Sequence, residues 1–289
     1  MSRNLYEEVT AKILADMEAG IMPWEKSWDG SKRGSFGIPT NAVTGRPYRG
    51  VNVLLLWGAS MRFDMNDMRF LTFKQALDAG GSVRKGEHGS KIVFYKPLAI
   101  KDKITEEDKT IPMLREFTVF HVSQTDGCKF AEISNEAPVI PSDTAELVSA
   151  IAVKVKHGGD RACYIPSADQ VLMPYAQDFK SEDAYRATLY HEITHWTGAK
   201  HRLDRNLRNS FGSTDYAYEE LVAELGGAFI CAEFGLPYQT QHASYLASWI
   251  KKLQDDKRMI LKASSAAQKA VDYIKSLVTA EPMALEMAA

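Results

Sequence analysis

The stretch DAYRATLYHEITHWTG, residues 183–198, carries the pattern that decides the fold. It is strongly helical, and His191 and His195 stand one helical turn apart, so both lie on one face and can point at a single ion. Glu192, beside the first histidine, can reach a water on that ion. A bound metal lowers the pKa of its water, and Glu192 takes the proton that is released. The spacing predicts a divalent metal site of hydrolytic geometry, with Zn²⁺ expected and Mn²⁺ or another divalent ion as alternatives.

Two sets of residues compete for the third ligand position. Read literally, residues 191–201 (HEITHWTGAKH) match HExxHxxGxxH, in which His201 would bind the metal as in three-histidine zincins, although no Met-turn is visible. The alternative lies in YEELVAELGG, on the next predicted helix, where Glu220 and Glu224 are one turn apart. In glutamate-ligand zincins the first acid of such a pair binds the metal and the second supports a ligand histidine. We favour Glu220 as the ligand, with Glu224 supporting a ligand histidine and as a further alternative ligand. The simpler alternative for Glu219 is that it only helps to cap the helix.

The segments around the motif predict a largely helical domain. Before it, CYIPSADQVLMP (163–174) has a proline near each end, which is typical of an edge strand. Zincins place such a strand beside the motif, where it lines the cleft. The predicted helices cover residues 144–158, 183–198, 215–235, 244–256 and 257–278, with a break near Asp255.

The first half of the chain predicts a small domain of helices and strands. A helix runs from the N-terminus to the first glycine, and LTFKQALDAGG (71–81) is a short helix capped by Thr72. The apolar run VNVLLLW (51–57) is a buried strand or helix, because periodicity does not distinguish the two. IVFY (92–95) pairs as a hairpin with LREFTVFHVSQ (114–124).

A domain boundary is expected in SNEAPVIPSD (134–143), which has two prolines and few helix formers. The predicted fold class is therefore α+β, with an N-terminal domain over residues 1–135 and a zincin-like, largely helical domain over residues 144–289.

Composition narrows the class of protein. The chain has 289 residues, a net charge of -2 and 45% hydrophobic residues, values of an ordinary soluble globular protein. No apolar stretch approaches the ~20 residues that span a membrane, and the N-terminus does not resemble a signal peptide. The three cysteines have no CxxC spacing, which argues against a disulfide framework and favours a reducing cytoplasm.

The charge is unevenly distributed along the chain. Residues 26–96 contain twelve Lys or Arg and five Asp or Glu, a local balance of +7. Between residues 22 and 95, aromatic residues alternate with basic and small ones. Single-stranded nucleic acid requires this mixture, since cations follow the backbone and rings stack on bases for ~1–3 kcal/mol each. We expect Trp57, Phe70 and Phe73 in the core of the domain. The candidate DNA contacts are Trp24, Trp28, Tyr48, Arg49, Arg84 and Lys85.

Several long blocks of the chain resemble the ArdC-type antirestriction proteins of conjugative plasmids. The blocks are LYEEVTAKILADMEAGIMPWEKSW, NAVTGRPYRGVNVLLLW and VRKGEHGSKIVFYKP in the first half, and CYIPSADQVLMP, YRATLYHEITHWTGAKHRLDR and YEELVAELGGAFICAEFGL in the second. The resemblance implies a single-stranded-DNA-binding domain fused to a metallopeptidase-like domain that helps incoming plasmid DNA escape restriction. It implies His191, His195 and Glu220 as metal ligands, and a host restriction-modification protein as a partner. The alternative function is an active metalloprotease that its DNA-binding domain directs to a specific protein.

Overall fold

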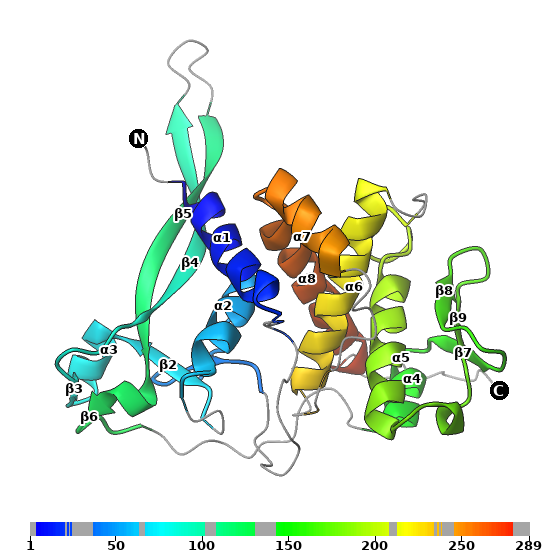
Figure 1. The fold of residues 1–289 in the computed structure, drawn as a ribbon, viewed down its shortest axis with the longest axis horizontal. Helices are drawn as coiled ribbons and strands as arrows, with labels where there is room; N and C mark the ends of the chain where they lie inside the picture. The colour runs from blue at the N-terminus through cyan, green and yellow to red at the C-terminus, as the bar shows by residue number, and fades with distance from the viewer. Residues whose placement is uncertain are drawn as a thin grey trace, which may run out of the picture. The chain divides into compact units, whose positions relative to one another are not determined.

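The computed structural model describes residues 4–20, 22, 24, 37–63, 67–101, 108–130, 143–207, 213–233, 236, 238 and 246–279. Its helices and sheets confirm the α+β class, and they form two compact units that are not continuous in sequence (Figure 1). Unit 1 is Met1–Pro23, Ile38–Ile133 and Leu253–Leu261, and unit 2 is Trp24–Gly37, Ser134–Lys252 and Lys262–Ala289. The linear division into 1–135 and 144–289 stays a prediction. Within the described ranges, no helix is both long and apolar enough to cross a bilayer.

The described part of unit 1 contains the strands β1 (Thr40–Asn41), β2 (Arg69–Thr72), β3 (Ser82–Val83), β4 (Ser90–Lys101), β5 (Asp108–His121) and β6 (Thr125–Asp126). Four of them form a sheet in the order β1-β2-β5-β4, and β3 pairs with β6. β4 and β5 are a long antiparallel hairpin, which confirms the predicted pairing of these segments. β2 pairs antiparallel with β5 and parallel with β1.

The helices described in the first half of the chain are α1 (Leu5–Glu18), α2 (Val51–Ser60), α3 (Phe73–Asp78) and the 3₁₀ helix η1 (Val122–Gln124). Asn4 caps α1 by accepting the N–H of Tyr6, and Gly20, at a φ of 75°, follows the end of the helix as expected. Thr72 caps α3, and with Gln75 it forms a reciprocal capping box.

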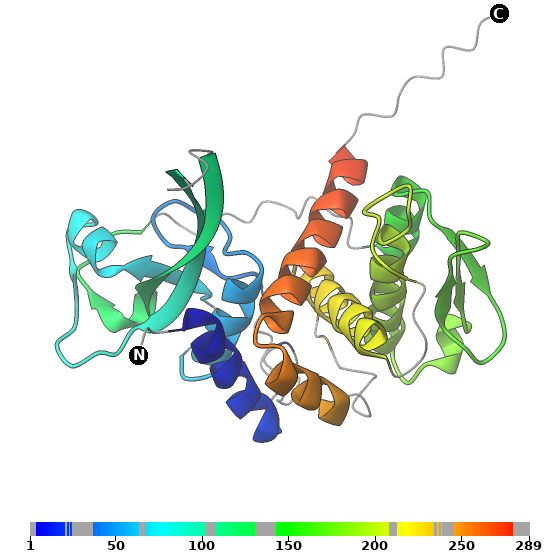
Figure 2. The same ribbon diagram turned by 90° about the horizontal axis from the view of Figure 1, so that it is seen from above.

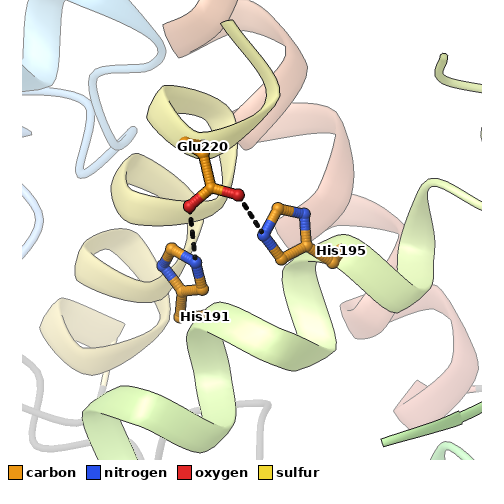
Figure 3. A group of neighbouring side chains, drawn as sticks. All are labelled: His191, His195 and Glu220. Atoms are coloured by element: carbon orange, nitrogen blue, oxygen red, sulfur yellow. Dashed lines mark ion pairs between the residues drawn. The ribbon is translucent and has the colours of Figure 1, made fainter. Parts of the chain in front are cut away.

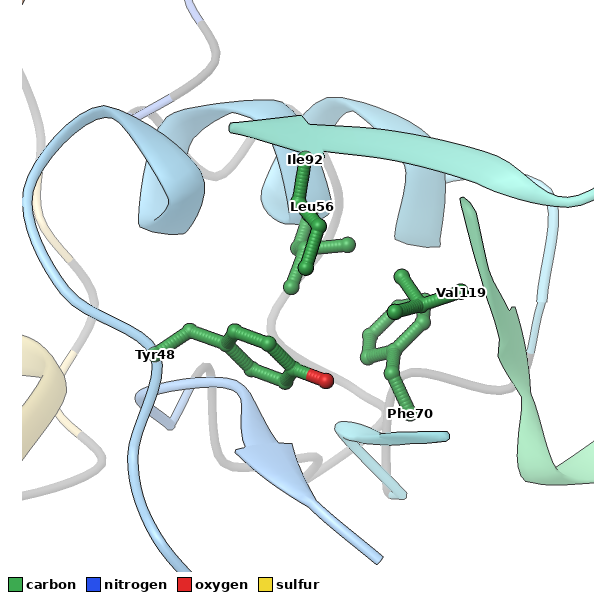
Figure 4. Close-up of a cluster of buried hydrophobic side chains, with 5 residues drawn as sticks. All are labelled: Tyr48, Leu56, Phe70, Ile92 and Val119. Carbon is green, nitrogen blue, oxygen red and sulfur yellow. The ribbon is translucent and has the colours of Figure 1, made fainter. Parts of the chain in front are cut away.

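The ambiguous apolar run 51–57 is helical, and α2 packs against the sheet. Figure 4 shows the buried side chains that join them: Tyr48, Leu56, Phe70, Ile92 and Val119. Asn52 is the polar exception on this helix and is 8% exposed. Its amide oxygen accepts the N–H of Val93 on β4, and its amide nitrogen donates to the C=O of the same residue, each at 2.8 Å. The side chain therefore satisfies a strand peptide group as a neighbouring strand would.

Two of the three aromatic residues predicted to lie in the core of unit 1 are buried there. Trp57 and Phe70 are fully buried, whereas Phe73 is 52% exposed, so its predicted core position is wrong. Phe73 is the first residue of α3, a helix so short that Ala76 is its one residue classed as buried.

The sheet of unit 2 corrects two expectations. Its strands, in the order β7-β9-β8, are β7 (Lys154–His157), β8 (Cys163–Ile165) and β9 (Gln170–Met173). The predicted helix 144–158 stops after α4 (Thr144–Ala150), because Ala152 takes a φ of 53° and the alternating VKVKH that follows pairs parallel with β9. The predicted single edge strand is a hairpin instead, in which β9 is central and β8 forms the edge.

The remaining elements described in the second half of the chain are the 3₁₀ helix η2 (Ala176–Asp178) and the helices α5 (Glu182–Thr197), α6 (Thr214–Glu233), α7 (Leu246–Asp255) and α8 (Met259–Thr279). All four helices and the break after Asp255 were expected from the sequence. Ser181 caps α5 by accepting the N–H of Ala184. Figures 1 and 2 both show α5 and α6 side by side, and the helices contact each other along their length.

The end of α7 and the start of α8 belong to unit 1. The hydroxyl of Thr10 on α1 donates to the C=O of Lys257 at 2.7 Å, and the guanidinium of Arg258 lies 4.9 Å from the ring of Tyr6. Met259 and Ile260 are buried. This late segment therefore completes a unit that is otherwise made from the first half of the chain.

Candidate metal centre

The two histidines of the motif lie on α5 and face α6. Both rings are largely withdrawn from solvent, with side-chain exposures of 3% for His191 and 12% for His195, and their centroids are 4.9 Å apart. Glu220 projects toward them from the second turn of α6 (Figure 3). The structure thus brings together the three residues that the sequence favoured as ligands.

The distances between these groups suit one shared ion. Two ligand atoms that each lie about 2.1 Å from a tetrahedral ion are roughly 3.4 Å apart. The Nε2 of His191 lies 3.8 Å from one carboxylate oxygen of Glu220, and the Nε2 of His195 lies 3.6 Å from the other. Both distances are too long for a hydrogen bond. One ligand atom from each of the three residues lies within 4.8 Å of the others.

The alternative third ligand, His201, is away from this group. Its side chain is 65% exposed, and its Nε2 lies 3.4 Å from a carboxylate oxygen of Asp169. The match to HExxHxxGxxH is therefore not realised as a three-histidine site.

Each histidine has a carboxylate at its other ring nitrogen. Glu224, expected to support a histidine, has an oxygen 3.7 Å from Nδ1 of His191. Glu219 has an oxygen 3.1 Å from Nδ1 of His195. The simpler alternative, that Glu219 only caps α6, does not hold, because the helix begins at Thr214 and the carboxylate contacts His195 on α5.

The surrounding charges set the protonation of this cluster. Burial alone would lower the pKa of His191, but the nearby carboxylates, Glu224 foremost, raise it to about 9. Burial would raise the pKa of Glu219, but contacts with His195 and Arg205 lower it. Without metal, His191 is therefore protonated at neutral pH.

The sequence did not reveal the role of Arg205. This residue follows α5 in the loop 198–207, and its guanidinium contacts Glu219, the C=O of Thr194 and the hydroxyl of Thr197. A Cβ on Gly198 would lie 2.8 Å from this guanidinium and 2.9 Å from Leu207. Because Gly198 has no side chain, the guanidinium of Arg205 can lie against it. This contact gives a reason for the glycine in HExxHxxG that does not involve His201 as a ligand.

Close approach of the two helices depends on a second glycine. A Cβ on Gly226 of α6 would lie 2.4 Å from the methyl of Thr194 and 2.6 Å from its hydroxyl. Thr194 is fully buried, and its hydroxyl donates to the C=O of Tyr190. Because neither side can give way easily, Gly226 fixes the separation of the helices that carry the histidines and Glu220.

Glu192 lies between the histidines and the edge strand of the sheet. Its side chain is buried, and one carboxylate oxygen accepts the N–H of Tyr164 on β8 at 2.8 Å. The backbone bond fixes the orientation of this carboxylate beside the cluster. The position fits the proton-accepting role expected for Glu192.

Two of the predicted DNA contacts are buried in the structure. Trp24 is fully buried and packs edge-on against Trp249 in unit 2, and Tyr48 belongs to the core of unit 1. As buried rings, these two candidates are not exposed for stacking on bases, because local sequence does not determine what a ring packs against. Trp28 lies outside the described residues.

The basic candidates remain at the surface. Arg49 and Lys85 are exposed, and Arg84, also exposed, pairs with Glu87 and Asp126. The candidate DNA contacts did not include the exposed aromatic residues of the long hairpin. Phe94 and Phe117 are 49% and 43% exposed and contact each other edge-on at 5.3 Å, and Tyr95 is 63% exposed. The exposed Arg115 is paired with Phe94 in the strand register.

Comparison with known proteins finds two family models that match successive parts of the chain. The model of a zincin-like metallopeptidase domain matches residues 142–266, and the model of the N-terminal domain of the anti-restriction factor ArdC matches residues 3–120. The fold and the site therefore define a protein with an ArdC-type N-terminal domain and a zincin-like metallopeptidase domain. The metal-free crystal structure of the antirestriction protein ArdC from plasmid R388 has a TM-score of 0.80 and 38% identity, over 96% of this chain and 98% of that one. This chain belongs to the ArdC family of antirestriction proteins.

Other relatives extend the comparison. The Mn(II)-bound structure of the R388 protein has a TM-score of 0.79 and 36% identity, over 97% of this chain and 100% of that one. The uncharacterized protein y4eC of Sinorhizobium fredii is 39% identical over 94% of this chain and 91% of its own length. The DNA primase TraC of Escherichia coli is 36% identical over 95% of this chain, which spans 27% of that protein.

Proposed function

We propose that this chain is a metal-dependent antirestriction protein that binds single-stranded DNA through unit 1 and protects incoming plasmid DNA from host restriction in the recipient cytoplasm. The arrangement of His191, His195 and Glu220 carries the proposal for the metal. A host restriction-modification protein is the expected protein partner.

The proposed ligand set is two imidazoles and one carboxylate, which several divalent ions accept. The R388 protein has a Mn(II)-bound structure, and the donor types also suit Zn²⁺. A bound ion would supply Lewis-acid polarisation and a water of lowered pKa. Glu192 would accept the proton, while the N–H of Tyr164 holds its carboxylate in place. Glu219 and Glu224 would keep the two histidines oriented through their Nδ1 atoms.

The metal site is tested by titrating the full chain with Mn²⁺ or Zn²⁺. We expect Glu220→Gln to weaken binding at least tenfold, because it removes an anionic ligand. Glu233→Gln is the matched control, since Glu233 lies on the same helix but pairs with Lys275. Equal affinities of the two variants would contradict the ligand assignment.

The proposal for DNA rests on exposed rings and cations of unit 1. Phe94, Phe117 and Tyr95 offer ring faces for unpaired bases, and Arg115 offers a cation nearby. Fluorescence anisotropy should show preference for a labelled single strand over a duplex, and binding that weakens with salt. The double change Phe94→Ala and Phe117→Ala should weaken binding about tenfold or more. Equal affinity for single strand and duplex would contradict the proposal.

The second candidate function is proteolysis of a specific protein, and the position of Glu192 beside the edge strand favours it. Glu192→Gln separates the two functions, because glutamine can still accept the N–H of Tyr164 while it no longer takes a proton. We expect this variant to retain metal and DNA binding and to lose any peptide hydrolysis. Protection against restriction that survives the change would show that proteolysis is not the mechanism.

A further inference from the structure

Arg205 makes a dense set of contacts beside the candidate metal ligands without touching them. Its Nε lies 3.0 Å from one oxygen of Glu219, and its Nη2 lies 2.9 Å from the other. The same Nη2 donates to the C=O of Thr194 at 2.6 Å, and Nη1 donates to the hydroxyl of Thr197 at 2.9 Å. The side chain is 10% exposed. One guanidinium therefore joins the last turns of α5 to the helix that carries Glu220.

These contacts determine which nitrogen of His195 faces the metal position. An ionised carboxylate only accepts hydrogen bonds, so Glu219, at 3.1 Å, requires the hydrogen of His195 to be on Nδ1. The lone pair is then on Nε2, the atom that faces Glu220. Because both oxygens of Glu219 are engaged by Arg205, this carboxylate is held away from the position that its neighbour Glu220 occupies.

We propose that Arg205 is a positioning residue for the metal centre: through Glu219 it fixes the tautomer and orientation of His195, and it keeps Glu219 from competing with Glu220 as a ligand. This inference rests on the proposed metal site. It also gives the motif glycine its function, since any side chain at position 198 would displace the guanidinium.

The loop offers a matched control for this arginine. Arg202 lies three residues earlier, its side chain is 3% exposed, and it pairs with Asp169 and lies over the ring of Trp196 at 3.8 Å. It is a buried, ion-paired arginine of the same loop, but none of its described contacts involves His191, His195 or the acids beside them. Arg202→Ala therefore shows how far metal affinity changes when a buried, ion-paired arginine of this loop is removed and the His195–Glu219 pair is left intact.

The experiment compares Arg205→Ala, Arg205→Lys and Arg202→Ala in the full chain, with Mn²⁺ affinity measured by titration. We expect Arg205→Ala to lose about 10- to 100-fold in affinity, the range typical of lost support for a metal ligand. Arg205→Lys should recover little of this loss, because one ammonium cannot span both oxygens of Glu219 together with Thr194 and Thr197. Arg202→Ala should stay within about twofold of the unmodified protein.

A second measurement reads the tautomer directly. In metal-free protein, ¹⁵N NMR should show His195 with its hydrogen on Nδ1, and Arg205→Ala should shift this resonance toward a mixture of tautomers. If Arg205→Ala does not fold, Glu219→Gln takes its place. Glutamine preserves side-chain volume but has only one acceptor oxygen, so it cannot engage Arg205 as both carboxylate oxygens do, and we expect a smaller loss in the same direction. Unmodified protein that binds neither Mn²⁺ nor Zn²⁺ refutes the proposed metal site. Unmodified protein that binds, with unchanged affinity and tautomer in the Arg205 variants or in Glu219→Gln, overturns the positioning role alone.

Discussion

The affinity of the centre for metal should rise steeply with pH, because a proton occupies one ligand when the metal is absent. The pKa of His191 is raised to about 9 by its surrounding carboxylates, while a metal binds only the neutral imidazole. At pH 7 roughly one molecule in a hundred has a neutral His191, so the proton weakens apparent binding about 100-fold. The factor falls to about tenfold at pH 8 and about twofold at pH 9.

The assay is a Mn²⁺ titration between pH 6.5 and 8.5, in which the electron paramagnetic resonance signal reports free Mn²⁺. The apparent association constant should rise about tenfold from pH 7 to pH 8. Calorimetry at pH 7 in buffers of different ionisation enthalpy should detect release of close to one proton per ion bound.

Glu224→Gln separates this cause from a general effect of pH. The carboxylate of Glu224 is the leading cause that raises the pKa of His191. Its replacement by an amide should lower that pKa and flatten the pH dependence, even if the variant binds less tightly at high pH. A change below about twofold between pH 7 and pH 8 in the unmodified protein, with little proton release, would refute the reasoning.

Three further outcomes follow from the fold. Because the pKa of His191 is raised in the folded state, its protonation stabilises the metal-free protein by roughly 3 kcal/mol below pH 6.5, and this stabilisation is lost as the pH rises through about 9. The melting temperature of the metal-free protein should therefore fall between pH 6.5 and about 9. A melting temperature that does not change over this range would contradict the assignment. Asn52→Leu leaves two buried backbone groups of Val93 without their partner and should lower the free energy of unfolding by about 2–4 kcal/mol in urea titrations, whereas a loss below about 0.5 kcal/mol would show that the pairing is unimportant. Gly226→Ala gains about 1 kcal/mol in helix propensity, but the new methyl group collides with Thr194. We therefore expect thermal unfolding to show a net loss of about 1–3 kcal/mol in the free energy of unfolding. Adding Thr194→Ala to the same chain should largely reverse this loss.

The sequence predicted the elements of the fold that depend on local pattern. The helix that carries His191 and His195 and the long hairpin of unit 1 have periodicities that their own residues define. The strand β7 was missed, because its alternation follows directly on helix-forming residues. Only its pairing with β9, a segment later in the chain, makes it a strand.

In the candidate site, too, the residues defined by local spacing were predicted and those that depend on contacts distant in sequence were not. Glu220 was found because ligand spacing within one helix is visible in sequence, and its distances to both histidines support that choice. Arg205 could not be found, because its role depends on the path by which the loop returns along α5. The burial of Trp24 likewise depends on Trp249, which no local pattern connects to it.

Because Leu253–Leu261 belongs to unit 1, this unit cannot complete its folding early in translation. A ribosome that has made residues through Ile133 has not yet supplied the C=O of Lys257 that the Thr10 hydroxyl requires, nor the buried side chains of Met259 and Ile260. Domains generally fold as units while the chain is made, the N-terminal one first. Here the N-terminal unit stays incomplete until both helices that carry the candidate ligands have been translated. A nascent or prematurely terminated chain that stops before Leu253 therefore lacks part of unit 1, and both units are completed only in the last stage of translation.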